Sequence, residues 1–324
     1  MRGYHLIAAA AAMLAQAAPA DAQEYPTKPV TIVVPFAAGG PTDTVTRLVA
    51  QSMTGTLGQQ VIVENVGGAG GTLGAARVAK AEPDGYTLLL HHIGQATSAI
   101  LYRQLSYDPA ADFAPIGIVV DVPMTIVARG DFPANDMKAL IEQVKAEGDV
   151  ITYANAGIGS ASHLCGMLLM QAFDVPLTTV AYKGTAPAMN DLLGSQVDLM
   201  CDQTTNTTGQ IKGGKIKVYA VTSPERVPSL PDVPTTAEVD LAAVQVGIWH
   251  GLYAPNGTDP AVVTRLEQAL QAAVTDPGVV QKLADLGAEP ATKEEATPAA
   301  LDKLVKDEIA RWRPVIEAAG QFAD

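Results

Sequence analysis

The chain has 324 residues, more than a single hydrophobic core usually serves, and its 48% hydrophobic and 17% charged residues predict a folded protein. Its 21 Lys and Arg residues and 34 Asp and Glu residues leave a formal net charge of -13. A surface this anionic repels the phosphate backbone of nucleic acids, so the composition argues against a nucleic-acid partner.

The first residues have the pattern of an export signal. Arg2 supplies a positive start, residues 6–18 form an apolar run too short to span a bilayer comfortably, and residues 20–22 match the small-x-small pattern of a cleavage site. We therefore expect residues 1–22 to be a signal peptide that is cleaved after Ala22. No later stretch approaches the roughly 20 apolar residues of a membrane span, so we expect an exported, soluble mature protein.

Short runs rich in Val, Ile and Leu alternate with helical patterns in two successive sets. The first set of expected strands is residues 30–35, 61–66 and 86–91, with a helix from about residue 42. The second set has expected strands at residues 151–154, 178–182, 197–201 and 216–222, and helices at residues 161–173 and 187–193. This alternation predicts mostly parallel sheets with helices on both faces.

An extended stretch follows each set, at residues 116–128 and 244–254, and we expect these two strands to link two lobes. Helical patterns at residues 260–274, 278–286 and 298–318 end the chain and are expected to pack back onto the first lobe. The sequence therefore predicts a two-lobed α/β protein with two crossover strands. The expected first lobe is residues 23–120 and 248–324, and the second is residues 121–247.

The sequence has two cysteines, Cys165 and Cys201. In an oxidising compartment they can form a disulfide. Two separate buried thiols are an equally good interpretation, because cysteine is commonly buried. The sequence leaves both alternatives open.

Each lobe has a Gly-rich loop between a strand and a helix. The first loop spans residues 35–43, and the second spans residues 155–163, with Ser160 as a natural helix cap. A helix start presents unpaired N–H groups and the positive end of the helix dipole, which favour an anion. Two such loops facing each other predict an anion site made of amides, which suits an acidic protein. For the first loop, a tight turn capped by Thr42 or Asp43 is the alternative.

Enzymatic interpretations find little support. Ser160 and His163 lie three residues apart at a helix start, so a secreted serine hydrolase is the alternative function, but the Gly-x-Ser-x-Gly spacing is not met. The Gly-rich residues 67–74 miss the spacing of a dinucleotide fingerprint. His91 and His92 are adjacent on a strand and are expected to point to opposite sides, which disfavours a shared metal ion. We expect no cofactor, no metal and no catalysis.

Polar side chains end several expected strands, where the cleft of a parallel sheet lies. His91 and His92 end one strand of the first lobe, and one packed and one solvated histidine is the alternative for this pair. In the second lobe, Tyr182 ends one strand, Thr185 follows it, and Asp202 ends another. We expect Asp202 to orient hydroxyls and amides rather than to meet an anionic ligand directly.

Several motifs in this order resemble the Bug-type, TctC-like solute-binding proteins of tripartite tricarboxylate transporters. The resemblance covers the whole mature chain. The motifs are PFAAGG at residues 35–40, VEN at 63–65, PDGYTL at 83–88, GIGS at 157–160 with HL at 163–164, YKG at 182–184 with AP at 186–187, and RW at 311–312.

This resemblance implies a two-lobed periplasmic binding protein of type II (Venus flytrap), a ligand with at least one carboxylate, and delivery to a membrane permease. In that family the loop after the first strand and the opposite Gly-Ser loop hold the carboxylate. We expect the protein to be periplasmic and monomeric. With the polar residues at the strand ends added, the expected ligand-binding residues are Phe36, Ala38, Gly39, Gly40, Pro41, Thr42, Asp43, His91, His92, Gly159, Ser160, Ala161, Ser162, His163, Tyr182, Thr185 and Asp202.

One segment departs from the family pattern. Residues 91–95 are His-His-Ile-Gly-Gln, where such proteins usually have small polar residues. These larger and partly aromatic groups alter the far end of the pocket. An aromatic mono- or dicarboxylate such as terephthalate is therefore the favoured ligand, through stacking and hydrogen bonding, and citrate-like or aliphatic dicarboxylates follow closely.

Overall fold

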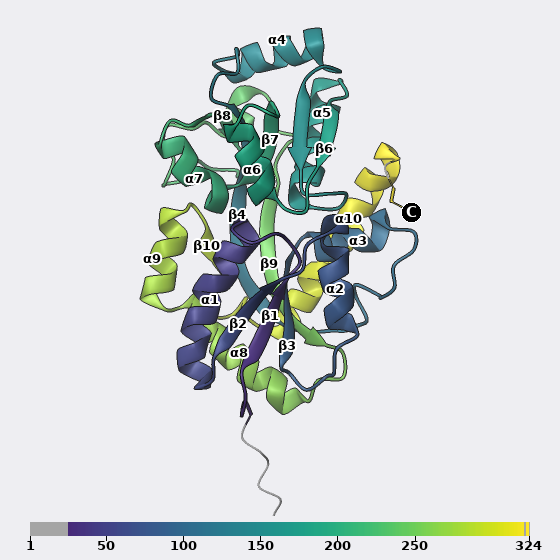
Figure 1. Ribbon diagram of the computed structural model, residues 1–324, viewed down its shortest axis with the longest axis vertical. Coiled ribbons are helices and arrows are strands. Elements are labelled where there is room, and N and C mark those ends of the chain that lie inside the picture. Colours follow the sequence, from purple (N-terminus) through teal and green to yellow (C-terminus); the bar gives the residue numbers. More distant parts are fainter. Residues whose placement is uncertain (1–24, 321, 324) are drawn as a thin grey trace, which may run out of the picture.

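The computed structural model describes residues 25–320, 322 and 323, so the signal peptide predicted for residues 1–22 lies outside the described residues. Two α/β lobes lie one above the other, with strands β4 and β9 at their junction (Figure 1). The predicted two-lobed α/β fold is confirmed. Within residues 25–320, no helix has both the length and the apolar character that crossing a membrane requires.

The first lobe is built on a mixed sheet in the order β2-β1-β3-β9-β4. Its strands are β1 (Val30–Val34), β2 (Val61–Asn65), β3 (Thr87–His92), β9 (Gly247–Pro255), the short β10 (Glu289–Pro290) and the first part of β4 (Phe113–Arg129). Strand β1 pairs parallel with β2 and β3, whereas β9 runs antiparallel to β3 and β4. The helices of this lobe are α1 (Pro41–Leu57), α2 (Thr72–Ala79), α3 (Gly94–Leu101), α8 (Pro260–Val274), α9 (Pro277–Asp285) and α10 (Pro298–Ala319).

The second lobe is built on the last part of β4, which pairs antiparallel with β7 and β8, while β5 pairs parallel with β6 and β7. Its other strands are β5 (Thr152–Asn155), β6 (Thr178–Ala181), β7 (Leu199–Gln203) and β8 (Ile216–Val221). Its helices are α4 (Met137–Glu147), α5 (Ala161–Phe173), α6 (Thr185–Leu193) and α7 (Thr204–Lys212). The sequence prediction missed α2, α3, α4 and α7.

Strand β4 connects the lobes, because residues 113–123 pair with β9 in the first lobe and residues 124–129 pair with β7 and β8 in the second. The second connection returns from β8 and becomes a strand at Gly247. Thr222 ties the two connections together, since its hydroxyl accepts the N–H of Met124 (3.0 Å) and donates to the carbonyl of Val246 (2.6 Å). The lobe boundaries expected at residues 120/121 and 247/248 stay a prediction.

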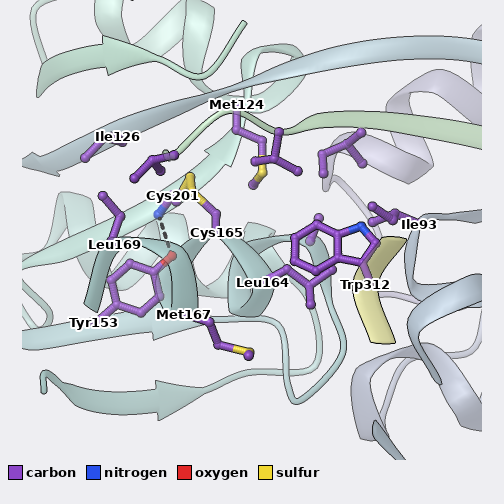
Figure 2. Packing of buried hydrophobic residues seen from close by; sticks show 14 of the residues in the cluster. Ile93, Met124, Ile126, Tyr153, Leu164, Cys165, Met167, Leu169, Cys201 and Trp312 are labelled. Atoms are coloured by element: carbon purple, nitrogen blue, oxygen red, sulfur yellow. Dashed lines mark hydrogen bonds between the residues drawn. A yellow bond between two sulfur atoms is a disulfide. The ribbon is translucent and has the colours of Figure 1, made fainter. Parts of the chain in front are cut away.

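The C-terminal helices pack on the first lobe, as predicted: α8 contacts α1, and α10 contacts α3. Helix α10 also reaches the second lobe through Trp312. Its buried indole lies close to Leu164 of α5 and near Ile93 of the first lobe, in one apolar cluster (Figure 2). The indole N–H donates to the carboxylate of Glu308 (2.9 Å), which satisfies the polar atom of an otherwise apolar side chain. The apolar core is therefore continuous across the two lobes.

Cys165 of α5 and Cys201 of β7 form a disulfide, with 6.1 Å between their Cα atoms (Figure 2). The alternative of two free thiols is therefore wrong. Beside the bridge, the buried phenol of Tyr153 donates to the carbonyl of Ser162 (2.6 Å) and accepts the N–H of Cys201 (3.2 Å). The disulfide and the two hydrogen bonds of the Tyr153 phenol thus fix the start of α5 against the end of β7.

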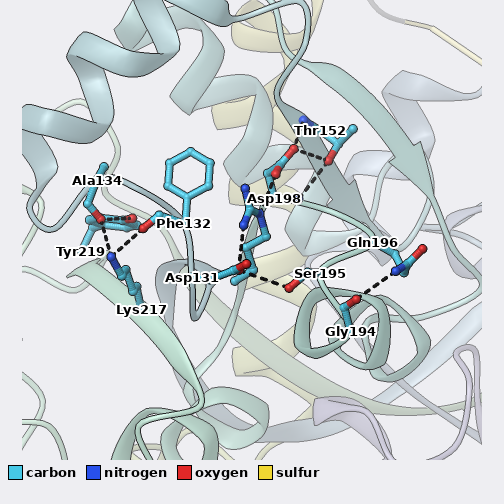
Figure 3. A network of polar contacts seen from close by, with 11 residues as sticks. Asp131, Phe132, Ala134, Thr152, Gly194, Ser195, Gln196, Asp198, Lys217 and Tyr219 are labelled. Carbon is cyan, nitrogen blue, oxygen red and sulfur yellow. Dashed lines mark hydrogen bonds and ion pairs between the residues drawn. The ribbon is translucent and has the colours of Figure 1, made fainter.

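A charged network holds the opposite end of the second-lobe sheet (Figure 3). Asp198, just before β7, accepts the Nε–H of Arg129 (2.8 Å) at the end of β4. It also accepts the N–H (2.9 Å) and the hydroxyl (2.7 Å) of Thr152 at the start of β5. This ion pair and these hydrogen bonds therefore lie at the amino ends of β5 and β7, away from the carboxyl ends of the two strands.

Removal of the disulfide is expected to destabilise the protein strongly. The bridge spans a sequence separation of 36 residues, and closing a loop of this length lowers the entropy of the unfolded chain by an amount worth about 4 kcal/mol. We expect the Cys165→Ala/Cys201→Ala variant to lose about 2–4 kcal/mol of unfolding free energy in urea denaturation. Reduced wild-type protein is the control, because it lacks the bridge but keeps both sulfur atoms. Two reactive thiols in unfolded wild-type protein that has not been reduced would contradict the disulfide.

Candidate ligand-binding site

A cavity lies between the lobes at the carboxyl ends of β1, β3, β5 and β7. Its volume is about 20 Å³, room for roughly one water molecule. Both lobes contribute to its wall. The lining residues are Phe36, Gly40, Pro41, Thr42, His92, Ala156, Ser160, Ala161, Ser162, Thr185, Asp202 and Gln203.

Four helices begin at this cavity. Helix α1 follows Gly40, which offers no side-chain cap, and α5 follows Ser160, whose hydroxyl caps the helix by accepting the N–H of His163 (3.2 Å). Helix α6 begins at Thr185, and α7 follows Gln203. The first turns present backbone N–H groups and the positive ends of the helix dipoles, so the wall favours negative charge without cationic side chains.

The lobes touch directly around this cavity. The N–H of Ala37 in the first lobe donates to the carbonyl of Lys183 in the second (3.0 Å), and the hydroxyl of Thr97 donates to the carbonyl of Gly159 (3.3 Å). The phenol of Tyr102 lies 2.7 Å from the carbonyl oxygen of Ala69 in its own lobe and 2.8 Å from that of Ile158 in the other. The structure therefore shows the lobes in a closed arrangement.

Asp43 holds the first Gly-rich loop in shape. Its carboxylate accepts the N–H of Gly39 (2.9 Å), the side chain of Asn65 (3.0 Å) and the Nε–H of Arg47 (2.9 Å). Burial opposes the charge, but these hydrogen bonds outweigh it and lower the pKa of Asp43. Asp43 therefore supports the loop from within the first turn of α1, and the Gly39 N–H is already occupied.

Three histidines and Phe36 form a buried ring cluster. Phe36 stacks on His92 with 4.7 Å between ring centroids and lies 5.6 Å from His91, and the two imidazoles lie 4.9 Å apart. The expectation that His91 and His92 point to opposite sides is therefore wrong. They end β3 where the chain leaves the sheet, and the N–H of Gly94 turns back to donate to Nδ1 of His92 (2.9 Å). The third histidine, His250, contacts the His92 ring edge-on.

These imidazoles are neutral near pH 7. Burial, with a smaller effect of His250, lowers the pKa of His91 to about 3. Burial also lowers the pKa of His250 to about 3 and that of His92 well below its usual range. The cluster therefore supplies no positive charge to the cavity. Among the described residues, no group of three or more His, Cys, Asp or Glu side chains could hold a metal ion.

The contacts of Ser160 are those of a helix cap. Its hydroxyl accepts the backbone N–H of His163 and lies 3.1 Å from the hydroxyl of Ser162. Nδ1 of the His163 ring accepts the N–H of Gly159 (3.3 Å), and the Ser162 hydroxyl accepts the N–H of Ala156 (2.9 Å). The hydroxyls and the imidazole thus order the turns of the second Gly-rich loop.

The structure separates the predicted ligand-binding residues into two groups. Those that line the cavity are Phe36, Gly40, Pro41, Thr42, His92, Ser160, Ala161, Ser162, Thr185 and Asp202. Those outside the lining are Ala38, Gly39, Asp43, His91, Gly159, His163 and Tyr182. Contact between a ligand and any residue of either group stays a prediction.

Particular contacts explain some of these positions. The phenol of Tyr182 donates to Asp191 of α6 (2.7 Å), within the second lobe. Ala156 and Gln203 line the cavity although the sequence prediction did not include them. The available signal for Gln203 was its place directly after Asp202 at the end of a strand.

A closed cleft between two α/β lobes, with helix starts from both lobes at its wall, defines a solute-binding protein with the periplasmic binding protein fold. The model of the tripartite tricarboxylate transporter family receptor matches residues 45–321. The chain therefore belongs to this receptor family, and the resemblance to its Bug-type members is confirmed.

Individual relatives agree. The solved structure of the periplasmic binding protein BugD is 57% identical, with a TM-score of 0.91 over 93% of this chain and 100% of that chain. MatC (Rpa3494) from Rhodopseudomonas palustris, solved with bound malate, is 43% identical, with a TM-score of 0.88 over 90% of this chain and 100% of that chain. The UPF0065 protein in the TAR-I ttuE-ttuC' intergenic region of Agrobacterium vitis is 52% identical over 93% of this chain and 88% of its own.

These similarities make the chain a periplasmic solute-binding receptor and not an enzyme. The alternative of a secreted hydrolase that uses Ser160 and His163 is wrong. The helix-capping contacts of Ser160 agree with this conclusion.

Asp202 is expected to reduce stability at neutral pH. Burial raises its pKa from 3.8 to about 6, although hydrogen bonds from Asn206 and Gln203 oppose the rise. A carboxyl group of this kind favours folding while protonated, and its contribution is lost as the pH rises from 3.8 to about 6. We expect Asp202→Asn to raise the unfolding free energy by about 1–3 kcal/mol near pH 8 and by much less near pH 4. Urea denaturation of both proteins at the two pH values measures this, and equal differences at both values would contradict it.

Proposed function

We propose that this receptor captures a small aliphatic dicarboxylate and delivers it to the membrane permease of a tripartite tricarboxylate transporter. One observation carries the proposal: helix starts from both lobes meet at one cavity whose described lining residues include no Lys or Arg. Aligned N–H groups in a dry site stabilise carboxylate charge at short range, which a net charge of -13 does not prevent.

The ligand gains part of its binding free energy from contacts that form only when the lobes close. In an open arrangement a ligand would meet the helix starts of one lobe only, and it gains the others when the lobes close. The contacts between Ala37 and Lys183 and between Tyr102 and Ile158 then form around it. Ligand binding therefore stabilises the arrangement that a permease can recognise as loaded.

The ring cluster favours an aliphatic ligand over an aromatic one. The sequence prediction preferred terephthalate-like acids because His91 and His92 could stack on them. In the structure these rings are buried against Phe36 and against each other, and of the two only His92 lines the cavity. The similar protein MatC was solved with bound malate. These observations support an aliphatic dicarboxylate of about malate size.

Three further expectations belong to this proposal. They are cleavage of the signal peptide after Ala22, a monomeric mature protein, and lobes formed by residues 23–120 with 248–324 and by residues 121–247. Mass spectrometry and light scattering on the secreted protein test the first two. Proteolysis with and without ligand tests the third.

A ligand screen tests the proposed function. Thermal unfolding of the mature protein is followed with succinate, malate, citrate, benzoate and terephthalate, because tight binding to the folded state raises the midpoint by mass action. We expect the aliphatic dicarboxylates to raise the midpoint most, with binding confirmed by titration calorimetry. A response to the aromatic acids alone would restore the sequence-based preference, and no response to any carboxylate would contradict the proposal.

Gly40 provides a test of closure. A Cβ there would lie 3.7 Å from the N atom of Ala186 and 3.9 Å from the hydroxyl of Thr185, at the start of α6 in the other lobe. Its φ of -83° suits any residue, so the branched Gly40→Val side chain is expected to obstruct closure without straining the backbone. We expect about a tenfold or greater loss of malate affinity in calorimetry. The matched control is Gly55→Val within helix α1, where a Cβ has no atom within 4 Å. Equal affinities of the two variants would contradict the role of Gly40.

A further inference from the structure

One wall of the cavity carries a buried carboxylate. Asp202 is 1% exposed and lines the cavity beside Thr185. Its Oδ1 accepts the N–H of Gln203 (2.9 Å), and its Oδ2 accepts the side-chain N–H of Asn206 (2.5 Å). An ionised carboxylate has about four acceptor positions, so these two contacts leave acceptor capacity unused.

Among the described lining residues, no cationic side chain neutralises this charge. The described lining residues include no Lys or Arg. The Thr185 hydroxyl lies near enough to favour the ionised form slightly, but it makes no hydrogen bond of normal geometry among the described residues. Oε1 of Gln203 is buried without a partner among the described residues, yet this amide can turn either end toward a ligand. Of these groups, Asp202 is therefore the one that requires a hydrogen-bond donor from the ligand.

A plain dicarboxylate suits this wall poorly. Its oxygens only accept hydrogen bonds, and two carboxylates facing each other in a desolvated site repel. A hydroxyl or ammonium group on the ligand would donate to Asp202 and remove the conflict. A hydrogen bond to a charged group changes an affinity by about 10- to 100-fold.

We infer that Asp202 selects a dicarboxylate whose carbon skeleton carries a hydrogen-bond donor, either a hydroxyl or an ammonium group. This inference rests on the proposed function and narrows its ligand class. The helix starts would hold the carboxylates, and the end of β7 would recognise the donor. The substituent between the carboxylates, more than the length of the ligand, would then decide which acids are taken up.

A matched ligand series tests the inference on the wild-type protein. Succinate, malate and aspartate are four-carbon dicarboxylates that carry hydrogen, hydroxyl and ammonium at one position. We expect calorimetry to show malate or aspartate binding about 10- to 100-fold more tightly than succinate. The tighter of the two identifies the preferred donor. Succinate binding as tightly as both would overturn the inference and leave the proposed function standing, whereas no binding of any of the three would count against the function itself.

Two variants assign the preference to Asp202. Asp202→Asn removes the charge, and Asp174→Asn, at the exposed end of α5, is the matched control in a left-handed position that Asn tolerates. We expect folded Asp202→Asn to lose most of the preference over succinate while its succinate affinity is kept or raised. The Asp174→Asn control is expected to keep the wild-type preference. An unchanged preference in Asp202→Asn would overturn the inference.

Measuring the number of protons taken up on binding tests a competing binding mode, in which Asp202 becomes protonated and donates a hydrogen bond to a ligand carboxylate. Calorimetry in two buffers of different ionisation enthalpy gives the number of protons taken up on binding. We expect no uptake by the wild type with its preferred ligand near pH 7.5. Uptake of about one proton that disappears in Asp202→Asn would overturn the inference.

Discussion

Peptide dipoles set the electrostatics of the cleft, because the helices that begin at its wall present N–H groups where other anion sites have cationic side chains. The field of a helix terminus falls off within about one turn. A ligand therefore feels all of these termini only when the lobes have closed on it. The charge of the whole protein matters less, since salt screens exposed charges beyond about 8 Å.

This arrangement requires a wall that keeps its shape, and buried groups behind the wall provide it. Asp43 fixes the first Gly-rich loop through Gly39 and Asn65. In the second lobe, Tyr153 and the disulfide fix the start of α5 against the end of β7. The ionised Asp43 and the disulfide that hold these loops therefore lie behind the cavity wall and not in its lining.

The sequence predicted the fold class, both Gly-rich loops and most of the cavity wall, because each loop joins a recognisable strand to a helix. It missed α3, which is buried on nearly all sides, and α7, whose run of threonines has no apolar period. For Asp43 it offered both ligand contact and a cap of the turn, and the structure shows the carboxylate of Asp43 accepting the N–H of Gly39. The pairing of Cys165 with Cys201 depended on a distance between two elements, which one sequence does not contain.

Tyr102 makes a contact between the lobes that can break without leaving a polar group unpaired when the lobes open. A phenol has one hydrogen to give, and here two carbonyl oxygens compete for it, one from Ala69 in the same lobe and one from Ile158 across the cleft. When the lobes part, the hydroxyl keeps its own-lobe acceptor, and the carbonyl of Ile158 is returned to solvent. Neither group loses its hydrogen-bond partners, so this contact forms and breaks with little change in free energy. Ligand release is then governed by the contacts of the ligand itself.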